Sequence, residues 1–136
     1  MFRKELDRRL QAIFDFSKTT YLAPSESYEQ DTLFIEIHRA LPNTSAASKT
    51  QRARVHGAIV VYSQGNRLPY GFFNKRLEQA DPALRRGLMF YETDIDVADS
   101  PARLQNIHER RANFLFLYDS EYDPNQGSLT SVNFGG

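Results

Sequence analysis

Three histidines are the residues with the widest chemical range, because imidazole binds metals and transfers protons near neutral pH. They are His38, His56 and His108, and none has the short spacing of a metal-binding motif. His38 and His56 fall on two adjacent predicted strands, and Glu36 shares a face with His38. A functional metal site needs several converging ligands and supporting partners. We therefore interpret the histidines as partly exposed strand side chains and expect no metal site.

Two acidic clusters follow predicted strands, and carboxylates in such positions can bind a divalent cation or transfer protons. Neither cluster has the loop pattern of a helix–loop–helix calcium site. Neither has a histidine, lysine or nucleophile beside it in a recognisable arrangement. We therefore expect solvated strand ends and keep a metal-dependent hydrolase as a third alternative. The clusters are Asp94, Asp96 and Asp99, and then Asp119, Glu121 and Asp123.

Several other kinds of chemistry lack the residues they need. The chain has no cysteine, so disulfides, zinc–thiolate sites and thiol catalysis are excluded. No Gly-x-Ser-x-Gly turn presents a nucleophilic serine. No Gly-x-x-x-x-Gly-Lys loop is available to hold a phosphate. We expect no cofactor and no enzymatic activity.

Charge is balanced over the whole chain but unevenly distributed along it. Lys plus Arg and Asp plus Glu both number 17. Residues 1–86 carry a net charge of +5, and residues 87–136 carry −5. A dedicated nucleic-acid binder is usually basic overall, so the balance argues against that class. Oppositely charged faces suit head-to-tail contact between copies, the contact that can close into rings. Ordinary solvated surface charge would give the same counts.

The elements that position these residues can be read from periodicity. Apolar residues at helical spacing predict an amphipathic helix over residues 1–17. Pro69 suits the first turn of a second helix, which Asp81-Pro82 interrupts and Gly87 ends. Alternating apolar residues predict the strands. The predicted strands are 32–41, 52–62, 88–97 and 107–118; the polar connection is 18–31, and the broken helix is 69–86.

This order, α-β-β-α-β-β, predicts an α+β domain over residues 1–119, with a four-stranded antiparallel sheet and helices on one face. The loop-like segment 42–50 joins the first two strands into a long hairpin. Residues 120–136 are polar and end in glycines, which predicts an extended C-terminal tail. No apolar run is long enough for a membrane helix, so we expect no membrane partner.

Side-chain alternation predicts which residues share a face. The centre of the last strand, 114–118, is apolar on both faces, which is typical of a central strand covered on both sides. Gly57 predicts a bulge or a close approach by another element. Each of the other predicted strands has one set of residues on a common face: Leu33, Ile35 and Ile37; Ala53, Val55, Ile59 and Val61; and Met89, Tyr91, Thr93, Ile95 and Val97.

The size and element order resemble the tail-terminator (tail-completion) proteins of long-tailed bacteriophages. The resemblance covers about residues 1–119. It implies a structural virion protein that forms a hexameric ring, caps the tail tube and joins it to the neck. Its partners would be copies of itself, tail-tube proteins and neck or connector proteins, with DNA only passing through the lumen. It would assemble in the host cytoplasm. The matching elements are Phe2–Phe16, Leu33–Leu41, Arg52–Tyr62, Pro69–Arg86, Leu88–Val97 and Ile107–Tyr118.

On this interpretation the hairpin tip and the terminal segment contact neighbouring subunits. A neck or connector ring protein is the nearest alternative. A small nucleic-acid-binding module is another, because arginines on a hairpin near aromatic residues can meet phosphates and bases. The arginines of that alternative are Arg52 and Arg54. The predicted interface residues are Arg39, Arg52, Arg54, His56, Tyr122, Val132 and Phe134.

Overall fold

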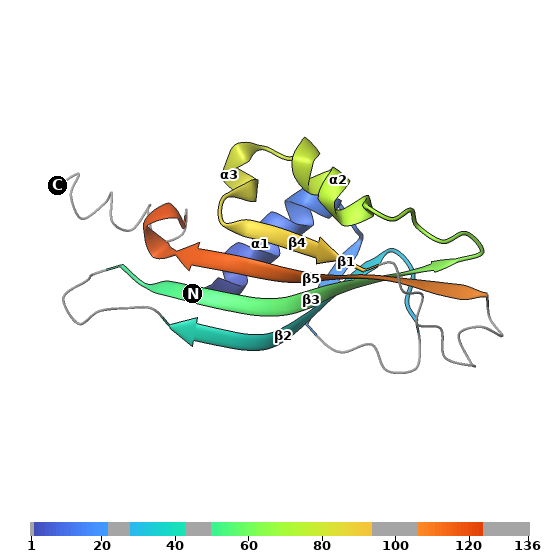
Figure 1. Ribbon diagram of the computed structural model, residues 1–136, viewed down its shortest axis with the longest axis horizontal. Coiled ribbons are helices and arrows are strands. Elements are labelled where there is room, and N and C mark those ends of the chain that lie inside the picture. Colours follow the sequence, from blue (N-terminus) through green and yellow to red (C-terminus); the bar gives the residue numbers. More distant parts are fainter. Residues whose placement is uncertain (1, 22–27, 43–49, 94–105, 124–136) are drawn as a thin grey trace.

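A five-stranded sheet with strand order β1-β2-β3-β5-β4 organises the chain. The computed structural model describes residues 2–21, 28–42, 50–93 and 106–123. In Figure 1 the helix α1 lies behind this sheet, and α2 and α3 lie along the side of β4. The helices are α1 (Phe2–Phe14), α2 (Phe72–Gln79), α3 (Pro82–Arg85) and the 3₁₀ helix η1 (Ser120–Tyr122), and the strands are β1 (Lys18–Thr20), β2 (Thr32–Pro42), β3 (Arg52–Gln64), β4 (Leu88–Glu92) and β5 (Ile107–Asp119).

The predicted α+β class is confirmed, but the four-stranded antiparallel sheet is wrong. Residues 18–20, expected within a polar connection, form β1 and pair in parallel with residues 32–34 of β2. The sheet is therefore mixed and has five strands. Asp15 adopts a left-handed backbone conformation (φ 54°) just after α1, which turns the chain back toward the sheet. The other pairings, β2 with β3, β3 with β5, and β4 with β5, are antiparallel.

The main core lies between the helices and one face of the sheet. The apolar stripe of α1 is buried there, with Leu6 and Leu10 wholly inaccessible. Phe14 is the centre of an aromatic group, with its ring centroid 5.7 Å from those of both Phe73 and Phe90. The alternation predicted for the hairpin is confirmed, since this cluster holds the residues Leu33, Ile35, Val55, Ile59 and Val61, with Ile37 and Ala53 packed against it.

Gly57 marks a close approach of other elements, as the sequence predicts. A Cβ atom at this position would collide with the backbone carbonyl oxygen of Glu36 and stand 2.7 Å from the ring of Phe114. The register between β2 and β3 shifts beside it, between Ile37 and Arg39, which indicates a β-bulge. A side chain therefore has no room where the three central strands pack most closely.

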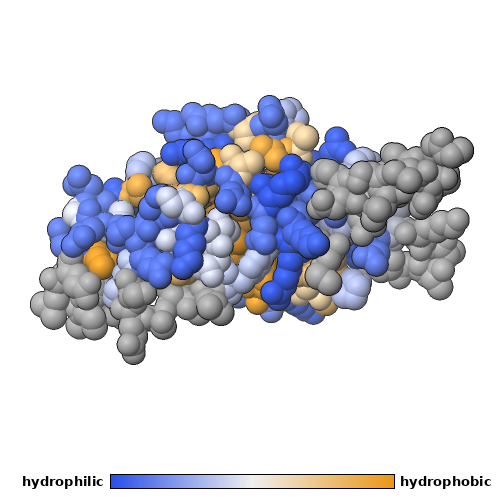
Figure 2. Space-filling model, turned by 180° about the vertical axis from the view of Figure 1, so that it is seen from behind, coloured by the Kyte–Doolittle hydropathy of each residue, from blue (hydrophilic) through white to orange (hydrophobic). Residues whose placement is uncertain are grey.

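The opposite face of the sheet is covered only in part. At one end a small second cluster buries Phe34, Val60, Tyr62 and Ile107, with Tyr28 against it. The prediction that β5 is a central strand is confirmed, since it lies between β3 and β4, but the prediction that it is covered on both sides is wrong, because Leu117 is 45% exposed. All three α-helices pack on the other side, so no helix of the described residues shields it. Figure 2 views the molecule from behind, from the side on which α1 lies. It shows that this helix-covered side of the molecule is mostly hydrophilic.

The chain after β5 turns back before it leaves the described residues. Ser120 and Gln51 bind each other through two hydrogen bonds, Ser120 N to Gln51 O (2.8 Å) and Gln51 N to Ser120 Oγ (2.7 Å). Asp123 is buried and accepts a 2.8 Å hydrogen bond from the Tyr118 hydroxyl. Residues 120–123 thus form a folded turn rather than the start of an extended tail. The rest of the predicted tail, 124–136, lies outside the described residues.

Candidate interaction surface

Exposed large apolar side chains gather on the uncovered face of the sheet. The described residues contain six such side chains, and four of them lie on this face. Met89 and Tyr91 on β4 are 39% and 55% exposed, and Leu41 on β2 is 36% exposed. Leu117 on β5 is the fourth. Exposed apolar groups that gather on one face mark interaction sites more often than scattered ones do.

Strand register places cationic side chains among these apolar ones. Arg54 on β3 lies between Leu41 and Leu117 in one row across the sheet. Directly opposed strand residues have Cβ atoms about 4.5–5.5 Å apart, so these side chains are neighbours. In the next row Arg39 opposes His56, and the row continues through Leu115 to Met89. The surface therefore alternates arginine with aliphatic groups.

Two of the arginines on this surface carry uncompensated charge. Arg39 and Arg54 form no ion pair with any residue that the structure describes. The described carboxylates on this face are engaged elsewhere: Glu36 accepts from Arg111 Nη2 (2.7 Å) and from His38 Nε2 (3.0 Å), Glu109 lies 3.8 Å from Arg111 Nε, and Asp119 pairs with Arg52. Burial raises the pKa of Glu36, but the hydrogen bonds from His38 and Arg111 outweigh it, and the pKa is lowered. Glu36 is thus ionised at neutral pH without neutralising the free arginines.

The structure brings four of the predicted interface residues onto one face of the sheet and places Tyr122 elsewhere. Arg39, Arg52, Arg54 and His56 share the uncovered face. Arg52, the first residue of β3, binds Asp119 with a 3.1 Å ion pair. Tyr122 lies apart on η1, where the Arg86 guanidinium stacks over its ring at 4.2 Å. Val132, Phe134 and the hairpin tip 43–49 lie outside the described residues.

The apolar members of the surface are the residues that sequence reasoning missed. Alternation correctly places Met89 and Tyr91 on one face of β4, but Leu88 and Phe90 on the other face are equally apolar. The structure buries Leu88 and Phe90 and exposes their neighbours. Apolar character could not decide between the two faces. Arg54, which lies opposite both Leu41 and Leu117, was the available signal that this face stays exposed.

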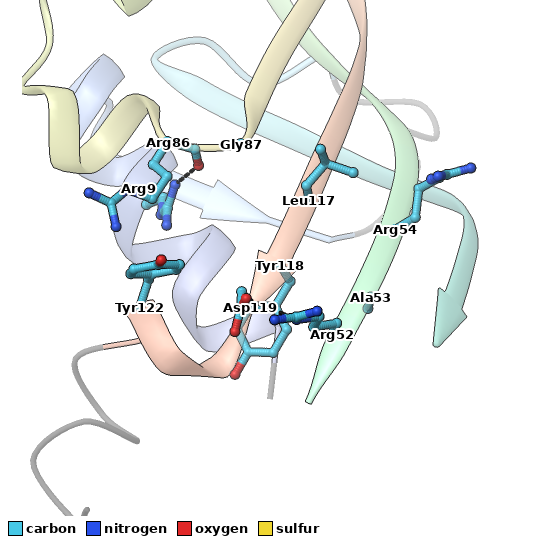
Figure 3. Close-up of a pocket in the computed structure, with 10 residues that line it drawn as sticks. All are labelled: Arg9, Arg52, Ala53, Arg54, Arg86, Gly87, Leu117, Tyr118, Asp119 and Tyr122. Atoms are coloured by element: carbon cyan, nitrogen blue, oxygen red, sulfur yellow. Dashed lines mark hydrogen bonds and ion pairs between the residues drawn. The ribbon is translucent and has the colours of Figure 1, made fainter. Parts of the chain in front are cut away.

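A second feature is a hollow of about 380 Å³ at the end of the sheet near η1, shown in Figure 3. Arg86 and Tyr122 stack on one side of it, and Arg52 and Asp119 stand on another. Arg9 stands beside Arg86, is 4% exposed, and donates to the Arg86 carbonyl oxygen. The lining residues are Arg9, Arg52, Ala53, Arg54, Arg86, Gly87, Leu117, Tyr118, Asp119 and Tyr122.

The carboxylates near this hollow have structural partners. Asp119 accepts from Arg52 Nε and from the Glu121 backbone N–H. Asp123 accepts from Tyr118, whose phenol pKa is raised by burial and then by this hydrogen bond, so Tyr118 stays a donor at neutral pH. No three of the described histidine and acidic side chains come together to hold a metal ion. Asp94, Asp96 and Asp99 lie outside the described residues.

A comparison with models of protein families and with curated proteins finds no match for this sequence. Among the described residues, no helix is long and apolar enough to cross a membrane.

Proposed function

We propose that this protein is a ring-forming structural subunit of a bacteriophage tail, a tail terminator that caps the tail tube and joins it to the neck. The observation that carries the proposal is the uncovered sheet face, where Met89, Tyr91 and Leu117 are exposed beside Arg39 and Arg54. Met, Tyr and Arg are enriched in protein–protein interfaces relative to the remaining surface. A face of this composition suits a protein partner.

The occupant we propose for this face is a second copy of the chain. Arg39 and Arg54 add unpaired positive charge to this face, while residues 87–136, which include β4 and β5, carry a net charge of −5 in the sequence. A cationic face on one copy meeting an acidic surface on the next is a head-to-tail contact, and such contacts close into rings when the rotation between copies allows it. The partners beyond the ring would be tail-tube and neck proteins in the virion, after assembly in the host cytoplasm.

The order of elements supports the terminator assignment within this class. A helix, a long hairpin, a broken helix and two closing strands are all present. A neck or connector ring protein would use the same kind of face and remains the nearest alternative. The nucleic-acid alternative is less favoured, because Asp119 neutralises Arg52, one of its two arginines.

The test is the size and shape of the purified protein, measured by multi-angle light scattering and negative-stain electron microscopy. We expect rings for the wild-type chain and smaller species for Tyr91→Ser and for Leu117→Lys. Tyr70→Ser is the matched control, because Tyr70 is 62% exposed but lies outside the uncovered face. A wild-type chain that stays monomeric at high concentration, also with tail tubes present, would contradict the proposal. A salt-sensitive gel shift with random DNA would favour the nucleic-acid alternative.

A further inference from the structure

The hollow beside η1 shares Arg54 and Leu117 with the uncovered face, but Arg86 and Arg9 in its lining take no part in the proposed function. Its lining includes four arginines and one carboxylate, a local net charge of +3. Glu5 compensates Arg9 at 2.9 Å, and Asp119 compensates Arg52 at 3.1 Å. Arg86 forms no ion pair with any described residue, and its guanidinium is held over the Tyr122 ring at 4.2 Å. The hollow therefore presents a positioned, uncompensated cation.

Arg9, which lines the hollow, is held by several contacts, and this limits the reorganisation that binding would require. Arg9 is buried, stacks over Phe116 at 5.1 Å and donates to the backbone carbonyls of Leu84 and Arg86. These contacts fix the turn that carries the Arg86 side chain. Figure 3 shows Arg86 and Arg52 on different sides of the hollow, with Arg54 pointing away from both.

We infer that this hollow binds an oxyanion, a phosphate or carboxylate group, with Arg86 as the anchoring cation and Arg52 as the second donor. Arginine is suited to this task because its planar guanidinium donates two parallel hydrogen bonds to such a group. Asp119 weakens the site, since it competes for Arg52 and repels the incoming anion. The site would exist in a single subunit, whether or not the chain forms rings.

The experiment is a thermal-unfolding titration of the full chain with sodium phosphate and, separately, with sodium glutarate, at constant ionic strength set by sodium chloride. A ligand that binds only the folded state raises the melting temperature with a concentration dependence that gives its Kd. We expect a saturable rise with at least one of the two anions, and which one acts identifies the source of the oxyanion. A rise with neither would overturn the inference.

Substitutions in the lining distinguish specific anion binding in the hollow from a general effect of salt on the melting temperature. Arg86→Ala should weaken binding at least about tenfold, the loss expected for one charge-assisted hydrogen-bonding partner. Asp119→Asn should tighten binding about two- to fivefold, because it frees Arg52 while the amide oxygen can still accept from Glu121 N. Lys75→Ala, which removes an exposed charge outside the hollow, should leave binding unchanged. An equal, non-saturating rise in the wild-type chain and Arg86→Ala would show a general effect of the salt and overturn the site.

Discussion

The carboxylate of Glu92, on β4, caps the N-terminus of α2 through Asn74. Its Oε2 atom accepts from the Asn74 backbone N–H (3.2 Å) and from Asn74 Nδ2 (3.0 Å), while Oε1 accepts from Phe73 N (3.2 Å). The residue before α2 is Gly71, which has a positive φ of 90° and no side chain to serve as a cap. A strand residue far along the chain thus supplies the acceptor that the helix start lacks.

Glu92→Ala should lower the free energy of unfolding by about 1–2 kcal/mol, because it leaves N–H groups of the first turn without an acceptor and removes a favourable charge at the positive end of the helix. Urea denaturation measures the change. Glu78→Ala, an exposed position on the same helix, is the control and should change stability by less than about 0.5 kcal/mol. Equal effects of the two substitutions would show that Glu92 is not a cap.

Gly57→Ala should destabilise the protein by about 2–3 kcal/mol, because the added Cβ meets the Glu36 carbonyl and the Phe114 ring and the central strands must move apart. Gly65→Ala is the comparison, since nothing lies within 4 Å of its Cβ and only the positive φ of 86° is strained. That substitution should cost about 1 kcal/mol. Chemical denaturation of both variants would distinguish crowding from backbone strain.

The buried pair Glu5 and Arg9 should be strongly coupled. Arg9→Met leaves the wholly buried Glu5 carboxylate with only Arg8 as an ion-pair partner and should cost about 3–5 kcal/mol. Adding Glu5→Leu to that variant should restore much of the loss, because the double variant no longer buries a carboxylate that has lost its buried cation. A double-mutant cycle by chemical denaturation gives the coupling. Additive effects would contradict the pairing.

Stability should depend on Glu36 in a pH-sensitive way. Its folded-state pKa is lowered, so its contribution is fully present above the unfolded-state pKa and is lost as the pH falls through the folded-state pKa. We expect Glu36→Gln to be less stable than the wild-type chain at pH 7, and the difference to shrink below about pH 4. Denaturant titrations across this range measure it. A difference that stays constant with pH would show that ionisation of Glu36 is not involved.

The folded unit should extend to Asp123 rather than end at Asp119. A chain ending after Asp119 loses the Ser120–Gln51 hydrogen bonds and the Tyr118–Asp123 bond. It should be about 2 kcal/mol less stable than a chain ending after Asp123, since it loses these three hydrogen bonds. Thermal unfolding of the two truncated chains compares them. Residues 124–136 stay predicted to act in assembly, so the chain ending at Asp123 should form fewer rings than the full chain.

Periodicity predicted the elements that have strong periodic signals, and missed what depends on tertiary contacts. The stripe of α1 and the alternation of the long hairpin were readable because each repeats over many residues. Strand β1 has only three residues, Lys-Thr-Thr, with no apolar alternation, and it forms because Asp15 turns the chain against β2. Three residues are too few to show a period.

The sequence predicted the arginines of the candidate surface but not its apolar members, whose exposure also depends on tertiary contacts. Its arginines stood out because charged side chains on a strand are rarely buried. Its apolar members did not, because exposure of Met89 and Leu117 depends on all the helices packing against the other face. The hollow could not be predicted either: it depends on Arg9 meeting Phe116 and the Arg86 carbonyl, groups that are distant in sequence.

The bulge in β2 hinders edge-to-edge strand pairing between copies of the chain. Beyond residue 34, β2 has no partner on its outer side among the described residues. That edge is broken by the bulge between Ile37 and Arg39, and it ends at Pro42, which lacks an N–H to donate. At the other edge β4 has only five residues, and Asn74 Nδ2 donates to its Phe90 carbonyl. Among the described residues, neither edge of the sheet is a good template for continued strand addition, which disfavours growth into fibrils.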